Sequence, residues 1–430
     1  MTRLDHTEEF GVHVCDARYG IVQRICERRT LVSLDGLNEF IARAYLPLGS
    51  ESSSADNGGR GERKSTAYCG AIGESIERYA LSIYDPSTLT VAPFDAVEDR
   101  ALSPDALRFF LDAQYRDPQF PFAPPQPTDH LAWIEGVDFV TGEATYVPAS
   151  LVFLPYRHLD DEPRLSHQIS PGASCHTSRE AAALSAVLEL VERDAFTIFW
   201  ETAAAFPRVA PDPVFDEVLR ASALDLDVDS FDISTDLEIP TALVLVRSTE
   251  GAHACLSYGM ASRPTFAEAH HSAWQEAVTS WISARTMIRG ERVPRDLLLE
   301  RMAAAPGFHL HMLWSALGYA DDDLRFVEDA APRAPTRDLT AASGTILEAV
   351  REKLRDRGCR VILVDITPSD VAELGFFAMR AVSTDLVRQS LGFHCRHLRN
   401  ERLTAVPKTL GLPHRHRTHR AIYENYRPEP

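Results

Sequence analysis

The feature that most constrains this chain is a pattern of two glutamates and an arginine, E-x-x-E-R, which occurs twice. It stands in "AIGESIERYA" and in "AVLELVERDA", and both segments have the composition of a helix. On a helix, positions i, i+3 and i+4 share one face. Each copy is therefore predicted to gather its three charged side chains on one side of a helix. The two sets are Glu74, Glu77 and Arg78, and Glu189, Glu192 and Arg193.

The surroundings of the second copy indicate that it is enclosed. A lone E-x-x-E-R is usually a solvated stripe with an intrahelical ion pair. Here the stretch from Ala181 to Phe199, "AAALSAVLELVERDAFTIF", is apolar or small on nearly every side of the cluster, which is typical of a buried helix. Buried carboxylates need partners. One arginine can neutralise one of the two glutamates, so each copy is left with an excess negative charge.

Composition excludes several classes of function. The chain has 430 residues and a formal net charge of −18, which disfavours nucleic acid as a partner because phosphate backbones are held by clustered positive charge. Its seven cysteines include no C-x-x-C pair, so we expect no zinc or iron–sulfur site and a reducing compartment. The N-terminal stretch is too polar for a secretory signal, and no apolar run approaches the ~20 residues of a membrane span. We predict a cytoplasmic protein without a membrane segment.

The order of the segments predicts an α+β fold with mixed sheets and packed helices. Long helices are expected from about Ser65 to Tyr84, Arg179 to Trp200 and Phe266 to Ile288. A further helix is expected over "ALSPDALRFFLDAQY", with Ser103 and Pro104 at its start. A β-hairpin is expected over "LAWIEGVDFVTGEATYVP", turning at "VTGE". The glycine-rich stretches "GSESSSADNGGRGER" and "ISPGASCHTS" are expected to be loops.

A glycine-rich loop followed by an E-x-x-E-R helix occurs twice, over 58–78 and 170–193. This indicates an internal duplication. We predict one domain over 1–410, with repeat-like halves of about 1–165 and 166–410, and an extended tail over 411–430.

Enclosed carboxylates beside loops rich in backbone N–H groups suit a hard divalent cation that also contacts phosphate. Mg²⁺ takes about six oxygens from carboxylates, phosphate and water, and glycine-rich loops and helix N-termini hold phosphates. The chain lacks G-x-x-x-x-G-K-[ST], so a P-loop is excluded. The residues alone therefore suggest duplicated carboxylate helices that bind a Mg²⁺-nucleotide.

Four segments resemble the motifs of the YcaO-domain family. "GRGERKSTAYCGAIGESIERYA" is similar to its first ATP-binding segment, "SPGASCHTSREAAALSAVLELVERDAF" to the second and "FAEAHHSAWQEAVTSW" to the third. "DITPSDVAELGFFAMRAVSTDL" resembles a late strand–helix unit. The resemblance covers nearly the whole chain. It implies a YcaO-type fold with pseudo-duplicated mixed sheets and helices around a central ATP and Mg²⁺ site.

The resemblance also implies roles for individual residues. The expected metal ligands are Glu74, Glu77, Glu189 and Glu192. The expected nucleotide-binding residues are Arg60, Arg78, Ser170, Ser174, Arg193 and Glu276. The proline-ended tail, with Pro428 and Pro430, is expected to reach the catalytic pocket and order it. The chain departs from the family pattern at Thr177, Thr279, Trp281, Thr384 and Asp385, and keeps every carboxylate.

Within the family, the chain looks most like the azoline-forming cyclodehydratases of modified-peptide pathways. These use ATP to convert Cys, Ser or Thr of a ribosomally made precursor peptide into thiazolines or oxazolines. The chain is close to the YcaO unit alone, so the resemblance implies a separate leader-binding partner (an E1-like or RRE protein) and a homodimer or larger hetero-oligomer. The resemblance also implies a flavin-dependent dehydrogenase as a later partner in such pathways. Two alternatives stay open: amide activation that forms a thioamide or amidine, and a non-catalytic ATP-binding scaffold subunit.

Overall fold

The structure is a computed structural model that describes residues 14–28, 36–47, 56–221, 226–248, 255–290, 293–304, 307–340, 344–392 and 395–413. The tail prolines Pro428 and Pro430 lie outside the described residues. The chain divides into two compact units. The first comprises 1–109, 121–190 and 359–385, and the second comprises 110–120, 191–358 and 386–430. The predicted division into repeat-like halves near residue 165 stays a prediction.

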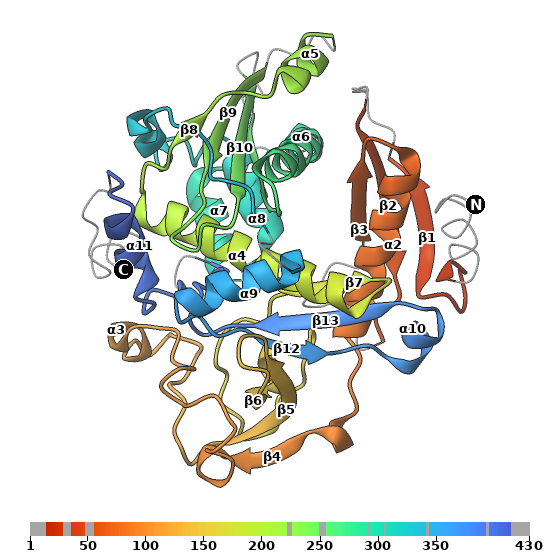
Figure 1. The fold of residues 1–430 in the computed structure, drawn as a ribbon, viewed down its shortest axis with the longest axis vertical. Coiled ribbons are helices and arrows are strands. Elements are labelled where there is room, and N and C mark those ends of the chain that lie inside the picture. Colours follow the sequence, from red (N-terminus) through yellow and green to blue (C-terminus); the bar gives the residue numbers. More distant parts are fainter. Residues whose placement is uncertain are drawn as a thin grey trace. The chain divides into compact units, whose positions relative to one another are not determined.

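The first unit contains two antiparallel sheets (Figure 1). A three-stranded sheet has the order β1-β2-β3, and the long helix α2 packs on it. A six-stranded sheet has the order β4-β5-β12-β13-β7, with β6 paired to β5. The elements are β1 Val22–Glu27, β2 Asn38–Ala44, β3 Asp56–Gly61, α2 Lys64–Leu81, β4 Thr90–Pro93, β5 His130–Asp138, β6 Ala144–Pro148, β7 Ala173–His176, β12 Ile362–Asp365, α10 Ser369–Glu373 and β13 Phe377–Val382.

The second unit is built on a four-stranded sheet of order β11-β10-β9-β8, with α6 packed against β10 and β11. The central strand β10 is almost continuously buried, as its apolar run "TALVLV" predicts. The elements are α3 Asp112–Tyr115, β8 Arg208–Val209, α5 Pro213–Ala221, β9 Leu226–Asp232, β10 Thr241–Ser248, β11 Cys255–Ser262, α6 Phe266–Gly290, α7 Arg295–Ala304, α8 Phe308–Ala316, α9 Ile346–Asp356 and α11 Arg402–Thr409. Helix α4, Arg179–Thr202, begins in the first unit and ends in the second.

The α+β prediction is confirmed, and so are the three long helices and the hairpin of β5 and β6. The predicted helix over 101–115 is wrong. Only one turn forms at its start, where Leu107 N–H donates to the Ser103 carbonyl, and only α3 is helical beyond it. The buried Gln114 explains why the chain turns there. Its amide binds the Leu111 N–H and the Arg396 carbonyl, so tertiary contacts outweigh local propensity.

The predicted loop over "DNGGRG" is also wrong, because these residues form strand β3. Glycine normally weakens a strand, but here it permits close helix packing. A Cβ on Gly59 would lie 2.0 Å from the Ala67 carbonyl oxygen and 2.1 Å from the Ala71 nitrogen of α2. Gly259 of β11 stands in the same relation to α6, where a Cβ would lie 2.2 Å from the Ala273 oxygen. Both helices therefore press directly on the backbone of the preceding strand.

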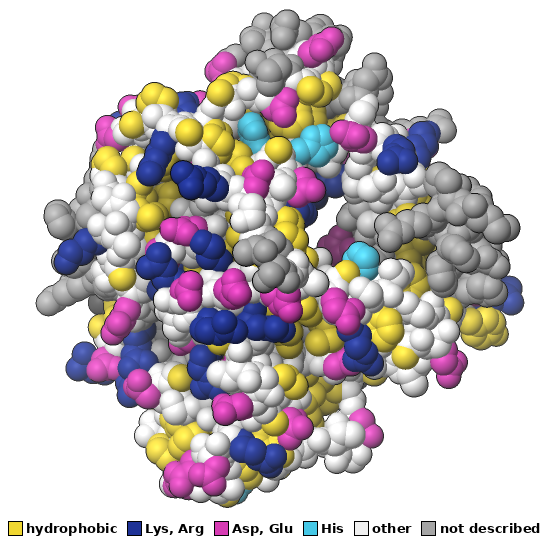
Figure 2. Space-filling model, in the orientation of Figure 1, with side chains coloured by type: hydrophobic (Ala, Val, Ile, Leu, Met, Phe, Trp, Pro, Cys, Tyr) yellow, Lys and Arg dark blue, Asp and Glu magenta, His cyan; other side chains and the backbone are white. Residues whose placement is uncertain are grey.

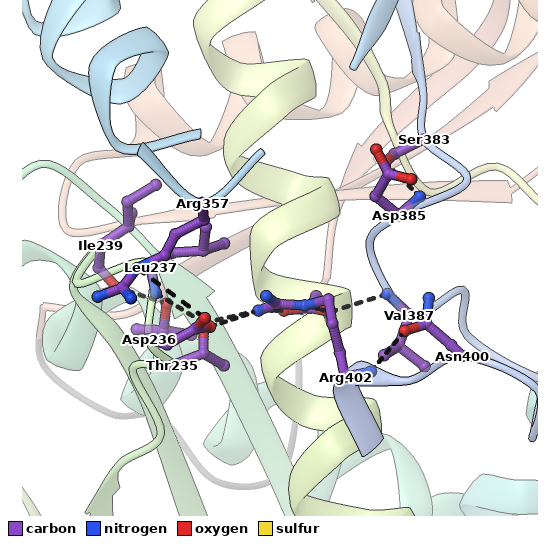
Figure 3. Close-up of polar contacts among 12 residues, drawn as sticks. Thr235, Asp236, Leu237, Ile239, Arg357, Ser383, Asp385, Val387, Asn400 and Arg402 are labelled. Atoms are coloured by element: carbon purple, nitrogen blue, oxygen red, sulfur yellow. Dashed lines mark hydrogen bonds and ion pairs between the residues drawn. The ribbon is translucent and has the colours of Figure 1, made fainter. Parts of the chain in front are cut away.

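A buried ion-pair network holds the C-terminal part of the second unit (Figure 3). The carboxylate of Asp194 on α4 is fully buried and accepts from Arg402 Nε at 3.0 Å and Nη2 at 2.7 Å. It also accepts from the Val387 N–H at 2.8 Å. Arg402 lies 2.9 Å from Asp236 as well. Asp194, the residue directly after the second E-x-x-E-R, thus anchors helix α11 through Arg402 and the preceding segment through Val387.

Acidic and basic side chains are interspersed over most of the face in Figure 2. Among the described residues, no helix combines the length and the apolar character needed to cross a bilayer.

Gly59→Ala is expected to destabilise the protein by about 1–3 kcal/mol, because the added methyl group collides with the α2 backbone. Gly73→Ala in α2 is the matched control. Nothing lies within 4 Å of its Cβ position, so the better helix former should raise stability by about 0.5–1 kcal/mol. Urea denaturation measures both. Equal effects of the two substitutions would contradict the close packing.

Arg402→Met is expected to cost about 3–5 kcal/mol of unfolding free energy, because it leaves the Asp194 carboxylate buried without its cation. Arg325→Met is the control. It removes the ion pair between Arg325 and Asp322, whose side chains are 67% and 82% exposed respectively. The cost should therefore be at most about 1 kcal/mol. The same denaturation assay applies. A cost for Arg402→Met no larger than that of the control would refute the anchoring role.

Candidate functional site

Three of the expected carboxylates lie in the first unit. Glu74 and Glu77 project from α2, and Arg78 binds both, with Nη2 3.2 Å from Glu74 Oε1 and Nη1 3.0 Å from Glu77 Oε1. Glu189 comes from α4. The Gly58 N–H donates to Glu74 Oε2 at 3.0 Å, and the Gly172 N–H donates to Glu189 Oε2 at 3.0 Å. The structure thus brings Glu74, Glu77 and Glu189 together beside glycine backbone, and their role as metal ligands stays a prediction.

The other expected carboxylates lie in the second unit. Glu192 is 6% exposed, accepts from the Ser262 N–H at 3.2 Å and pairs with Arg193 at 3.3 Å. Glu276 on α6 accepts from the Met260 N–H at 3.1 Å. Arg193 Nη1 also donates to the sulfur of Met260 at 3.5 Å. This unit therefore holds two carboxylates near one arginine.

The same local arrangement occurs three times. A strand or loop leads into a long helix, and a glutamate of that helix accepts from a backbone N–H of the segment before it. The glutamate lies ten positions after the first residue of the helix each time: 74 from 64, 189 from 179 and 276 from 266. Sequence analysis found two copies. The third, β11 with α6, was missed as a repeat because it lacks the second glutamate and the arginine.

Charge in the first-unit cluster is unbalanced. Glu74, Glu77 and Glu189 face two arginines, Arg78 and Arg380. Burial raises the pKa of Glu77 to about 8, and the nearby carboxylates of Glu189 and Glu74 raise it further against the opposing effect of Arg78. A carboxylate with this pKa is largely protonated at neutral pH. The cluster can thus accommodate additional positive charge from a bound cation.

Arg380 is a site residue that sequence analysis missed. It lies on β13, is 1% exposed, and its Nη2 donates to the carbonyls of Ile169 at 2.8 Å and Leu151 at 3.2 Å. Its Nη1 donates to the carbonyl of Ser170. Burial lowers its pKa to about 10, and Glu189 and Glu77 oppose that shift. The signal was an isolated arginine inside the apolar strand "FAMRAV".

The remaining expected residues are placed as follows. Ser170 and Ser174 flank Gly172, in the loop and the strand β7 that precede α4. Arg60 is exposed on β3, where it faces Glu39 of β2 in the strand register. Side chains alternate along a strand, and the neighbouring Gly59 faces α2. Arg60 therefore lies on the sheet face away from α2 and its glutamates.

Comparison with known proteins identifies the family. Residues 58–387 match the family model described as YcaO cyclodehydratase, ATP- and Mg²⁺-binding. The chain belongs to the YcaO cyclodehydratase family. The family resemblance, the α+β YcaO-type fold and the cofactors ATP and Mg²⁺ predicted from the sequence are thereby confirmed.

Two curated relatives are similar to this YcaO chain. One, from Methanothermobacter thermautotrophicus, is 26% identical over 182 residues, 41% of this chain and 42% of the relative. The other, in the tfuA 3′ region of Rhizobium leguminosarum bv. trifolii, is 27% identical over 321 residues, 70% of this chain and 69% of the relative. The chain thus spans less than half of the first relative.

Solved structures share the fold of this YcaO chain. A heterocyclase in complex with substrate and cofactor has a TM-score of 0.74 at 18% identity, over 96% of this chain and 55% of that one. The YcaO of Methanopyrus kandleri bound with AMPPCP and Mg²⁺ has a TM-score of 0.61 at 20% identity, over 90% and 91%. The E. coli microcin synthetase McbBCD complex has a TM-score of 0.61 at 14% identity, over 87% and 93%.

The residues of the YcaO chain fit a Mg²⁺-nucleotide. In the described part of the chain, no three Asp, Glu, His or Cys side chains are grouped as a ready metal cage. Mg²⁺ needs no such cage beside a nucleotide, because it typically uses one or two carboxylates together with phosphate and water. The backbone N–H bonds fix one oxygen of Glu74 and one of Glu189, and Glu77 can release its proton when a cation binds beside it.

Glu77→Gln is expected to weaken binding of Mg²⁺-AMPPCP about tenfold or more in titration calorimetry, because a charged oxygen ligand is lost. Without nucleotide its thermal stability should stay level, since a carboxyl group that is largely protonated there is replaced by a neutral amide of the same shape while Arg78 keeps Glu74. Glu98→Gln, at an exposed position, is the control and should bind as the natural chain does. Unchanged affinity in Glu77→Gln would exclude this glutamate as a ligand.

Proposed function

We propose that this YcaO chain carries out ATP-dependent cyclodehydration of Cys, Ser or Thr residues in a ribosomally made precursor peptide, forming thiazolines or oxazolines. The observation that carries the proposal is the thrice-repeated carboxylate anchored to backbone N–H groups, in a chain of the YcaO cyclodehydratase family. The fold shared with a heterocyclase in complex with substrate and cofactor supports it.

The proposed reaction has three steps. The thiol or hydroxyl of the peptide loses its proton to solvent and attacks the preceding amide carbonyl carbon, which forms a tetrahedral adduct. The γ-phosphoryl group of ATP then moves to the adduct oxygen and ADP is released. The carbon–oxygen bond finally breaks and phosphate leaves, while the nitrogen gives its proton to solvent and the C=N bond forms. ATP becomes ADP and phosphate, and the peptide loses the elements of one water per ring.

The residues of the chain contribute positioning and charge in this proposal. Glu74, Glu77, Glu189 and Glu192 hold Mg²⁺, which offsets phosphate charge when bound. Arg78 and Arg193 hold those carboxylates and stabilise charge on the phosphoryl group during transfer. Ser170, Ser174 and Glu276 contact the nucleotide, with Glu276 held by the Met260 N–H. Arg60 lies on the sheet face away from α2. If it binds the nucleotide, it would contact a part of it that is remote from the phosphates held near these glutamates.

Partners and the tail are part of the proposal. The McbBCD complex, whose structure was also solved with pro-MccB17 bound, supports a peptide substrate and a separate leader-binding subunit for this chain. A hetero-oligomer in the cytoplasm and a later flavin-dependent dehydrogenase fit the same scheme. The tail prolines Pro428 and Pro430 are proposed to order the catalytic pocket, so deletion of the last five residues should abolish ring formation and spare Mg²⁺-ATP binding.

The test is mass spectrometry of a candidate precursor incubated with the chain, its leader-binding partner and Mg²⁺-ATP. We expect loss of one water per modified residue, with the thiols of modified cysteines no longer open to alkylation. Glu192→Gln should still form the complex with the leader-binding partner and should lower the rate of ring formation about 100-fold or more. Glu98→Gln should form rings at the rate of the natural chain. Exchange of oxygen for sulfur would assign the thioamide reaction instead. Unchanged ATP turnover in Glu192→Gln would assign the catalysis to another subunit.

A further inference from the structure

A pocket in the second unit lies beside the Glu192 cluster and has no role in the scheme above. Its volume is ≈ 80 Å³. One wall is formed by the stacked rings of Phe196 and Tyr258, whose centroids lie 5.2 Å apart at 20°. Phe196 is one helical turn after Glu192 on α4. Tyr258 is two residues before Met260 on β11, so both project from the same face of that strand.

The pocket has no net charge. Two of its lining residues, Glu201 and Arg396, form an ion pair with side chains only 6% and 5% exposed. A third, His311, is half-buried, and desolvation lowers its pKa to about 4, so it is neutral at pH 7. Among the residues that the structure describes, these three and Tyr258 are the ionisable groups that line the pocket. A charged ligand group would lose its hydration here without a counter-ion, so the pocket selects an uncharged one.

The pocket also contains buried polar atoms that have no hydrogen-bond partner in the described part of the chain. Thr197 is 4% exposed, and its hydroxyl has no partner within the structure. The side-chain amide oxygen of Gln389 is buried and also has none. Such groups usually carry a cost and are nearly always satisfied by protein, water or ligand. An unpaired amide oxygen calls for a donor, so the group that completes the site carries an O–H or N–H.

We propose that this pocket binds a flat, uncharged, hydrogen-bond-donating ring on a side chain of the precursor peptide, such as the phenol of tyrosine or the neutral imidazole of histidine. The aromatic wall packs against the ring, and the Gln389 oxygen accepts from its donor. This inference rests on the proposed function for the identity of the peptide. It makes the pocket a specificity site for a residue near the amide that is modified.

The size of the pocket favours a side chain over the base of the nucleotide. Space of ≈ 80 Å³ equals the liquid volume of roughly three water molecules, at about 30 Å³ each. A phenol or imidazole ring exceeds this space by less than the larger adenine base does. The adenine base of the nucleotide is therefore the alternative ligand, and the experiment must distinguish it from a peptide side chain.

The test uses small probes with ligand-observed NMR on the whole chain: 4-methylphenol, 4-methylimidazole, toluene and adenine. We expect 4-methylphenol to bind with a dissociation constant on the order of 1 mM. Toluene, which has the ring without the donor, should bind about tenfold more weakly because the buried oxygen stays unpaired. Equal binding of the two, or no binding of either ring, would overturn the proposal without use of any variant.

Variants assign the site. Thr197→Val with Gln389→Leu should weaken 4-methylphenol about tenfold, to the level of toluene. Thr404→Val with Gln119→Leu makes the same chemical changes at exposed positions and should have no effect. Displacement of 4-methylphenol by adenine would assign the pocket to the base and overturn the proposal. The readout is binding rather than turnover, so failure of the proposed reaction and failure of this inference are visible separately.

Discussion

The interaction on which the site depends is the hydrogen bond from a backbone N–H to a glutamate of the following helix. It recurs between Gly58 and Glu74, Gly172 and Glu189, and Met260 and Glu276. A long flexible side chain near other carboxylates would otherwise turn toward water. Tying one oxygen to a rigid strand or loop fixes the orientation of the carboxylate before any cation arrives. Preorganisation of this kind removes a reorganisation cost from both binding and reaction.

The sequence was sufficient for the parts of the fold in which local pattern and tertiary role agree. Helices α2, α4 and α6 combine helical periodicity with apolar surroundings, and the hairpin of β5 and β6 has a glycine turn. The sequence was insufficient where contacts with residues distant in the chain determine the local structure. Strand β3 forms from glycines because α2 packs on its backbone at Gly59, and no local preference encodes that. Arg380 acts through carbonyls more than 200 residues away in the chain.

The second unit contains two environments that differ in polarity. Glu192, Glu276 and Arg193 form a charged group anchored on β11, whereas the pocket beyond Phe196 and Tyr258 has no net charge among its described lining residues. The stacked rings separate the two. Aromatic walls of this kind limit access of water, and exclusion of water strengthens the electrostatic interactions of the groups behind them. In the proposed scheme, the side chains that hold phosphate charge and those that select a peptide residue can thus be tuned independently.

The order of strands in the six-stranded sheet affects how the chain folds as it leaves the ribosome. Strand β12 lies between β5 and β13, and β13 pairs with β7. The strands that complete the sheet are thus synthesised about two hundred residues after those they join. Domains usually fold in the order of synthesis, but this first unit must wait until most of the second has emerged. Its open β5 and β7 edges are exposed throughout that interval, which makes nascent chains of this protein candidates for chaperone binding.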